Sequence, residues 1–210
     1  MQTSSYRANY RNLSSSQSNE KMLLAQEYRK WHFFDSRSNL PHRINSVWKI
    51  DSGLVKGYTL LEDGSIVTLG VWSSGEIVSR IFTNIKPYEL ECLTEVKASL
   101  VPWKKSEENI DLLLTYIQSV HELGIIRDYK TTDMMIIKLF DWLGKKIGKK
   151  VPNGKLIDVR LTHQDIADIL GITRVTVTRN LNQLERQGRI KQNSLHRFIL
   201  NEEEIWHYEI

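Results

Sequence analysis

The stretch LTHQDIADILGITRVTVTRNLNQLERQGRI, residues 161–190, has the spacing of two short helices joined by a tight turn. Thr162 is a good helix N-cap, and Asp165 three residues later can close a capping box on the backbone donors of the first turn. Gly171 stands where the chain must adopt a backbone conformation that a side chain would strain. Small Ala167 lies four residues earlier, where the two helices would touch. These positions together predict a helix-turn-helix.

The second helix is predicted to begin after Thr173, another N-cap residue. Val177, Leu181 and Leu184 recur at intervals of four and three, the spacing of a buried helix face. Four polar residues fall outside that stripe: Arg174, Thr176, Thr178 and Arg179. Arginine can offer two parallel donors to guanine O6 and N7, the commonest specific base contact in the major groove. We therefore expect a DNA-reading helix, with an ordinary helical hairpin bearing solvated arginines as the alternative.

A small hairpin, or wing, should follow this helix, because Gly188 can end it and residues 190–199 are apolar around a break at Asn193 and Ser194. Residues 145–197 hold twelve Lys or Arg against four Asp or Glu, whereas residues 1–144 hold seventeen of each sign. The basic excess is therefore local, as a phosphate-binding face requires. The lysine run at positions 145, 146, 149 and 150 fits either a solvated face or a steering role.

Composition sets the outer bounds. With 210 residues and 40% hydrophobic content, the chain has room for two small domains. The single cysteine, Cys92, excludes an internal disulfide and a four-cysteine iron–sulfur site, and we expect it to be a core residue. No apolar run approaches the roughly 20 residues that span a bilayer, and the N-terminus lacks the apolar region of a signal peptide. We therefore expect a cytoplasmic protein without membrane contact.

The first two thirds of the chain predict an arm and a sheet domain. Residues 1–20 have no periodicity and predict a flexible arm. Residues 21–105 predict an antiparallel β-roll, because apolar residues alternate among glycines and Asp63-Gly64 is a hairpin signal. A continuous strand segment from Tyr88 to Leu100 should close the roll. The predicted fold class is α+β.

Residues 106–130 predict one long helix, and residues 131–210 the winged helix-turn-helix domain. The stripe of the long helix comprises Ile110, Leu113, Leu114, Ile117, Val120 and Leu123. A helix that joins two small domains cannot bury a whole stripe in either, so pairing with a second copy is expected. The prediction is a homodimer, and the alternative is that the stripe packs only on the roll.

This order of parts resembles the Crp/Fnr superfamily of bacterial transcription regulators. TRVTVTR, residues 173–179, is similar to the recognition helix of the cyanobacterial nitrogen-control branch, and residues 53–78 resemble the family's roll, with Gly75-Glu76 at its turn. The resemblance implies a cupin-like roll of the cyclic-nucleotide-binding type. It also implies a homodimer on an inverted repeat of double-stranded DNA, and RNA polymerase as a partner.

The resemblance also implies roles for individual residues. Arg174 would read a guanine and Arg179 a base or nearby phosphate, and Thr178 is a further base-reading candidate. Val175 replaces an acidic residue of the cyclic-AMP receptor, so a thymine methyl contact and a GTA-type half-site replace the TGTGA type. The expected DNA-backbone contacts are Thr162, His163, Gln164, Thr173, Thr176, Asn182, Arg189 and Lys191. Asn180 is polar where the family has an aliphatic residue, which suggests a looser helix face or a further DNA contact.

The effector is left open by the sequence. A cyclic-AMP pocket needs an Arg followed by Ser or Thr, whereas Arg80 is followed by Ile81, so cyclic AMP is not expected. Binding of 2-oxoglutarate would need converging cations, for which Arg80 and Arg127 are weak candidates. Haem is not expected without a Cys-His pair at a roll turn, and no metal site or certain cofactor is predicted.

Two other classes of function remain as alternatives. The first is an effector-independent regulator that acts mainly through contacts with RNA polymerase or a co-regulator, which the missing phosphate grip favours. The second is a nucleic-acid-processing enzyme with a winged-helix appendage. The sequence lacks a nucleophile-base pair, metal-spaced ligands and a Gly-rich phosphate loop, so no catalytic residues and no enzymatic activity are expected.

Overall fold

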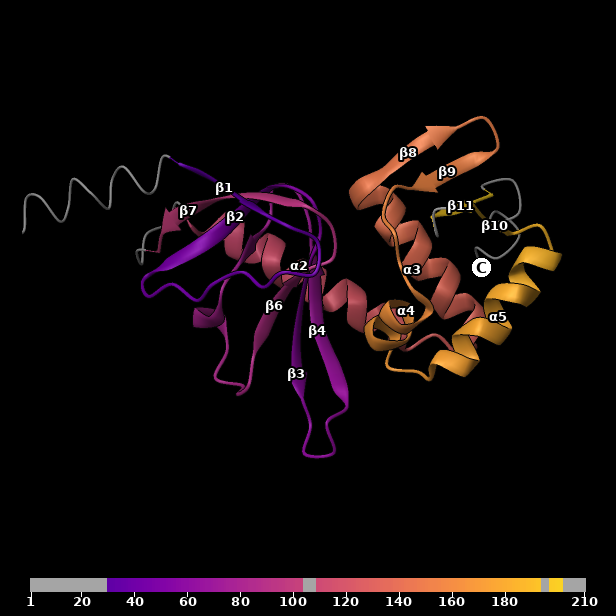
Figure 1. Cartoon of the computed structure of the whole chain (residues 1–210), viewed down its shortest axis with the longest axis horizontal. Helices are drawn as coiled ribbons and strands as arrows, with labels where there is room; N and C mark the ends of the chain where they lie inside the picture. Colours follow the sequence, from indigo (N-terminus) through magenta and orange to yellow (C-terminus); the bar gives the residue numbers. More distant parts are fainter. Residues whose placement is uncertain (1–29, 104–108, 194–196, 202–210) are drawn as a thin grey trace, which may run out of the picture.

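The computed structural model describes residues 30–103, 109–193 and 197–201, and within them the chain has the predicted α+β architecture (Figure 1). The N-terminal part is a roll of two antiparallel sheets with strand orders β1-β7-β2-β5 and β4-β3-β6. Its elements are β1 (Trp31–Phe34), β2 (Ser46–Ser52), β3 (Val55–Leu60), β4 (Ile66–Trp72), β5 (Ile77–Val78), the 3-10 helix η1 (Arg80–Phe82), β6 (Glu89–Cys92) and β7 (Val96–Pro102). The predicted arm at residues 1–20 lies outside the described residues.

The roll confirms one local prediction and corrects another. β3 and β4 form the expected hairpin, with Leu60 opposite Ile66 and Gly64 at a positive φ of 80°. The predicted continuous strand from Tyr88 to Leu100 is wrong, because β6 and β7 lie in different sheets. The break falls at residues 93–95. There the Thr94 hydroxyl accepts a hydrogen bond from the backbone N–H of Leu54, just before β3, and donates one to the Glu95 carbonyl, so the chain turns at this point.

The C-terminal part holds four helices and a second antiparallel sheet with strand order β10-β11-β9-β8, among the residues described. Its elements are α2 (Ile110–Arg127), α3 (Thr132–Ile147), β8 (Gly148–Val151), β9 (Gly154–Ile157), α4 (His163–Leu170), α5 (Arg174–Arg186), β10 (Ile190–Gln192) and β11 (Phe198–Leu200). The wing prediction is confirmed, since Ile190 pairs with Leu200. The β8–β9 hairpin was not predicted, because its lysines conceal a short strand pattern.

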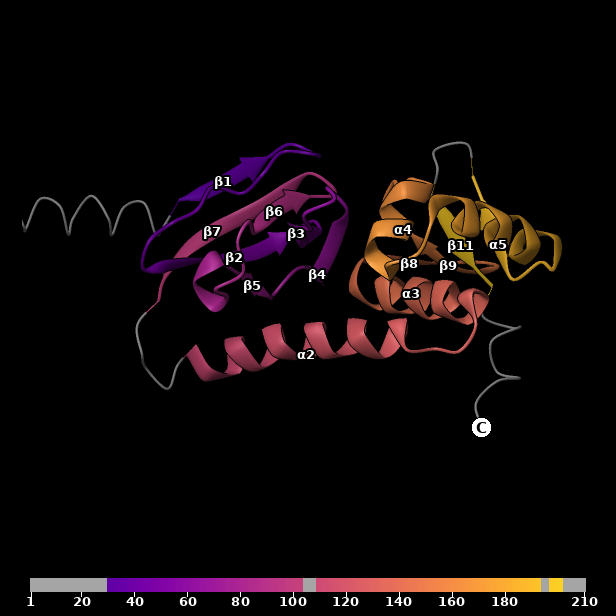
Figure 2. The same cartoon turned by 90° about the horizontal axis from the view of Figure 1, so that it is seen from below.

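The two parts pack closely against each other. Figure 2 shows α2 running along one side of the molecule beneath both the roll and α3, and Figure 1 shows α4 between the roll and α5. One apolar cluster joins Leu54, Val71 and Leu93 of the roll to residues of α2, α3, α4 and α5. The helix-turn-helix therefore shares a hydrophobic core with the roll. Among the described helices, none is both long and apolar enough to cross a membrane.

Candidate nucleic-acid interface

The start of α4 is fixed by the predicted capping box. The Thr162 hydroxyl accepts a hydrogen bond from the Asp165 N–H at 3.1 Å, and the Asp165 carboxylate accepts one from the Thr162 N–H at 2.8 Å. At the other end, Gly171 has a left-handed φ of 71°, and its N–H donates to the Ala167 carbonyl at 2.8 Å. Both local predictions are confirmed, so the turn of the motif follows from its own residues.

The second helix, α5, places its apolar and polar residues on opposite faces. The Thr173 hydroxyl caps it by accepting from the Thr176 N–H at 3.2 Å. Its apolar face is buried and comprises Val177, Leu181 and Leu184. Arg174 and Arg179 are exposed, and Val175 between them is 79% exposed. The helix forms the outer edge of the C-terminal part in Figure 1, and within the described part of the chain its polar face is exposed at these three residues.

His163 and Thr178, two residues expected to contact DNA, form a hydrogen bond with each other. The Thr178 hydroxyl lies 2.8 Å from His163 Nδ1 and also donates to the Arg174 carbonyl at 3.0 Å. These bonds link the N-terminus of α4 to the first turns of α5. Asn180 donates its side-chain amide to the Thr176 carbonyl at 2.8 Å, so this polar residue bonds to its own helix.

The residues expected to hold the DNA backbone divide into two groups. Thr162, Gln164, Thr173, Asn182 and Lys191 are exposed, and Thr176 is half-buried. The placement of Arg189 in this set is wrong, because it is 9% exposed and its Nη1 lies 3.7 Å from the Asp133 carboxylate of α3. Its charge therefore serves the packing of the C-terminal domain.

The apolar stripe of α2 is divided between two faces. Ile110, Leu114, Ile117 and Ile125 are exposed, and at about 100° per residue they fall on one side of the helix. Leu123, 1% exposed, is part of the core of this chain itself, so its assignment to the dimer seam is wrong. Its thirteen-residue distance from Ile110, at about 100° per residue, turns it roughly 140° round the helix.

Val120 is not part of the exposed face of α2 either, because its side chain packs against the core of the roll. Leu113 is half-buried at the edge of the exposed stripe. Ile125 was not predicted as part of the stripe, yet it is 64% exposed and lies on the same face as Ile117. The exposed apolar surface therefore covers a narrower sector of the helix circumference than the predicted stripe, and it extends further along the helix, to Ile125.

The two cations proposed for an effector bind protein oxygens. Arg80 Nη2 lies 2.6 Å from the Glu89 carboxylate of β6. Arg127 donates to the backbone carbonyl of Thr68 in β4 at 2.7 Å and to that of Ile169 in α4 at 2.8 Å. Burial lowers the pKa of Arg127. This side chain links the roll to the C-terminal end of α4, where a cation also suits the helix dipole.

Aromatic side chains fill the junction between the roll and α2. Trp72, which is fully buried, stacks on Tyr116 of α2 with ring centroids 4.9 Å apart, and Phe82 meets the same tyrosine at 4.8 Å. A Cβ at Gly70 would lie 2.4 Å from the Trp72 ring, so the close approach of this ring requires glycine. The chain's own rings thus occupy this part of the roll.

The single thiol lies in the roll core. Cys92 is fully buried, and burial raises the pKa of its thiol to about 11. The thiol therefore stays protonated at neutral pH, as a structural cysteine does. Across the described ranges, no group of three or more His, Cys, Asp or Glu residues could hold a metal ion.

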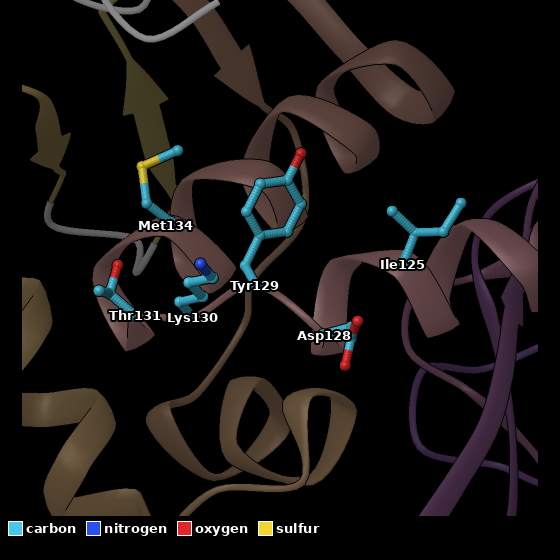
Figure 3. Close-up of a pocket in the computed structure, with 6 residues that line it drawn as sticks. All are labelled: Ile125, Asp128, Tyr129, Lys130, Thr131 and Met134. Carbon is cyan, nitrogen blue, oxygen red and sulfur yellow. The ribbon is translucent and has the colours of Figure 1, made fainter. Parts of the chain in front are cut away.

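An open pocket of about 510 Å³ lies where α2 gives way to α3 (Figure 3). Its lining is Ile125, Asp128, Tyr129, Lys130, Thr131 and Met134. Figure 3 shows the Tyr129 ring between Met134 and Ile125. Since Ile125 also belongs to the exposed face of α2, the pocket continues that apolar surface toward the C-terminal domain.

Contacts between charged residues that the sequence analysis did not predict join the roll to the C-terminal domain. Arg37 and Lys56 of the roll face carboxylates of α4. Lys146 of α3 lies 2.7 Å from the buried Glu76 carboxylate and donates to the Ser119 hydroxyl of α2 at 2.8 Å. These contacts connect residues far apart in sequence, so no local pattern could have indicated them.

Most of the lysine run is paired with carboxylates. Lys145 Nζ lies 2.8 Å from Asp141 one turn away, and Lys149 pairs with Asp158. Together with Lys146, three of the four lysines thus bind acids of the same chain. On α5 itself, Arg174, Arg179 and Arg186 are exposed.

Roll, long helix and exposed basic helix together define a winged helix-turn-helix regulator. A family model described as the Crp-like helix-turn-helix domain matches residues 135–206. Regulatory protein CysR of Synechococcus elongatus is 38% identical over 159 residues, which cover 73% of this chain and 76% of that protein. The chain belongs to the Crp/Fnr family of transcription regulators.

Other relatives support the same assignment. The Global nitrogen regulator of a Synechocystis species is 29% identical over 163 residues, 68% of this chain and 70% of that protein. Among solved structures, FixK2 of Bradyrhizobium japonicum matches with a TM-score of 0.69 at 16% identity, covering 86% of this chain and 97% of that one. TTHB099, a CRP-family regulator of Thermus thermophilus, matches with a TM-score of 0.68 at 19% identity, covering 81% and 92%. These structures confirm the fold.

Proposed function

We propose that this chain is a sequence-specific DNA-binding regulator that acts in the cytoplasm and binds an inverted-repeat operator as a homodimer, without catalytic activity. One observation carries the proposal: α5 buries its apolar face and turns Arg174, Val175 and Arg179 outward. The N-terminus of α4 lies beside it, and its Thr162 and Gln164 are exposed there. This is the arrangement in which a recognition helix enters the major groove.

The operator follows from the chemistry of the exposed side chains. Arg174 can bind guanine O6 and N7, and Val175 offers apolar surface to a thymine methyl but no acceptor to cytosine N4. We therefore propose a GTA-type half-site. Two-fold symmetry places the half-sites about 34 Å, or one helical turn, apart.

Selection of bound sequences from random DNA with the purified protein tests the operator. The expected result is an enriched inverted repeat with a guanine in each half-site. Enrichment of no sequence, or of unpaired sites alone, would overturn the proposal. As a companion variant, Lys191→Ala should weaken all sequences alike and lower the salt slope, because a phosphate contact carries no base information.

The exposed face of α2 supports the dimer. Ile110, Leu114, Ile117 and Ile125 form one apolar surface on a helix whose other face is already packed. Leu114→Asp should convert the dimer to a monomer in sedimentation experiments. Thr115→Asp, also exposed on α2 but outside this surface, is the matched control. Equal dimerisation of both variants would show that this face does not pair.

A second candidate function is an effector-independent regulator that acts mainly through contacts with RNA polymerase or a co-regulator. The aromatic filling around Trp72 and Tyr116 favours it, because these rings occupy the junction of the roll and α2. The test adds small metabolites of a cell extract to the purified protein. A metabolite that raises the melting temperature and changes operator affinity together would support ligand control and contradict this candidate.

A further inference from the structure

A loop of the roll bonds directly to the first helix of the helix-turn-helix. Arg37 follows β1, and its Nη1 and Nη2 donate to the two carboxylate oxygens of Asp165 at 2.6 and 2.7 Å. This two-pronged geometry is the strongest form of the arginine–carboxylate pair. The Asp165 side chain is only 7% exposed and that of Arg37 is 41% exposed, so the carboxylate is shielded from water while the guanidinium reaches it from the surface.

A second cation of the roll extends this contact along α4. The Lys56 side chain is 2% exposed, and its Nζ lies 2.8 Å from Glu91 and 3.9 Å from Asp168. Glu91 also accepts from Arg37 at 3.2 Å, and Asp168 accepts from the Gln164 amide at 2.6 Å. One network thus connects the roll to the polar side of α4.

The backbone at Arg37 is unusual. Its φ of 70° lies in the left-handed region, which is unfavourable for a residue with a side chain. Its N–H donates to the Cys92 carbonyl at 2.7 Å, and the flanking Ser36 hydroxyl donates to the Leu93 carbonyl at 3.1 Å. The roll therefore holds a strained residue in place, and such residues cluster where a defined geometry is required.

Asp165, the carboxylate bound by Arg37, is connected by hydrogen-bonded residues to the proposed DNA-contacting face. Asp165 closes the capping box with Thr162, and the adjacent His163 ring bonds to Thr178 of α5. Burial raises the pKa of Asp165, but hydrogen bonds from Arg37 and Thr162 outweigh it and hold the pKa below its usual range. The carboxylate therefore stays ionised and bound at neutral pH.

We propose that Arg37 and Lys56 are positioning residues for DNA binding, which hold α4 so that its N-terminus and α5 face the DNA together. This inference rests on the proposed function, namely that α4 and α5 bind DNA. Arg37 acts through Asp165, since its guanidinium is committed to Asp165 and Glu91. The roll is then a structural part of the reading head, separate from any role in sensing.

The test compares Arg37→Gln and Arg37→Lys with Lys97→Gln in the full chain. Lys97 is a matched control, because its Nζ lies 2.8 Å from Asp51 and both residues belong to the roll. Affinity for the selected operator should fall about tenfold in Arg37→Gln, the scale of coupling between packed elements. Arg37→Lys should be intermediate, because an ammonium cannot make both bonds in parallel. Lys97→Gln should bind as the wild type does.

Three further readouts separate positioning from other roles. Base preference and the salt slope should be unchanged in Arg37→Gln, while the backbone amides of α4 should exchange hydrogen faster without DNA. A salt slope reduced by about one would show instead that Arg37 contacts a phosphate. A lower melting temperature with unchanged affinity and unchanged α4 exchange would show a merely structural role. Either result overturns the proposal.

Arg174→Ala, measured in the same assays, distinguishes this inference from the proposed function. If Arg174→Ala keeps the wild-type base preference, the assignment of the reading helix is wrong. If Arg174→Ala loses discrimination while Arg37→Gln binds and exchanges like the wild type, the assignment stands and only the positioning role is wrong.

Discussion

The two helices of the helix-turn-helix use their polar residues in opposite directions. On α5, Arg174 and Arg179 are exposed and the opposite face is buried. On α4, Asp165 and Asp168 turn toward Arg37 and Lys56 of the roll. The difference separates two tasks: α5 carries the groups suited to reading bases, whereas α4 carries the groups that fix where the motif sits. Substitutions on the two helices should therefore affect different measurements.

The largest effect is expected for Asp165→Ala on α4. This change removes the capping carboxylate and leaves the Arg37 guanidinium without its main partner. The free energy of unfolding should fall by about 2–3 kcal/mol, the sum of a lost cap and a partly buried ion pair. Urea denaturation measures it. Asp51→Ala, which removes a more exposed carboxylate, should cost about 0.5 kcal/mol or less; equal losses would contradict the role assigned to Asp165.

Arg174→Ala should show the opposite behaviour. Discrimination for one guanine per half-site should fall by about 1–3 kcal/mol, because the two parallel donors are lost. The free energy of unfolding should change by about 0.5 kcal/mol or less, since the side chain is exposed. Binding measured on operators altered at each position gives the first quantity, and urea denaturation the second. Unchanged base preference would place base reading elsewhere.

A smaller change in specificity is expected for Val175→Glu. The carboxylate can accept a hydrogen bond from cytosine N4, whereas the valine offers only apolar contact. Preference at one base pair per half-site should move toward a pair that presents cytosine, by about 1 kcal/mol. Random-sequence selection with the variant measures it, with Val175→Ala as the control that adds no acceptor. The same operator for both variants would show that this position does not face a base.

The smallest effect concerns pH. Burial acts to raise the pKa of Asp165, but its hydrogen bonds with Arg37 and Thr162 hold it below the ordinary value of 3.8. Because the folded-state pKa is lower than the unfolded one, the ionised carboxylate stabilises the fold above about pH 4, and this contribution disappears as the pH falls through the folded value. The difference in unfolding free energy between wild type and Asp165→Asn should therefore shrink between pH 5 and pH 2, as urea titrations at each pH would show. A difference that grows with acid would contradict the ionised pair.

Sequence reasoning succeeded where the determining interactions are local. The capping box of Thr162 and Asp165 spans three residues, and the left-handed Gly171 is set by its own backbone. The buried face of α5 follows from a repeat within thirteen residues. Such features need no knowledge of the rest of the chain, because side chains three and four positions apart are neighbours on a helix.

It failed where distant segments determine the outcome. The bond between Arg37 and Asp165 joins residues 128 positions apart, and neither residue type indicates its partner. Leu123 was assigned to a dimer seam, because a list of apolar residues does not show which face the roll covers. Arg189 belongs to a basic surface by composition, yet it turns inward to Asp133. In each case tertiary packing decided which face a side chain occupies.

The β8–β9 hairpin has a consequence for the behaviour of the protein at high concentration. β8 is an outer strand of its sheet, and the outer strand of a sheet can pair with a strand of another molecule. Its residues Lys149 and Lys150 are both exposed along that edge. Lys149 is paired with Asp158, whereas the charge of Lys150 at the same edge would oppose pairing with the same edge of a second molecule, so the last lysine of the run can help to keep copies of the chain from joining through their sheets.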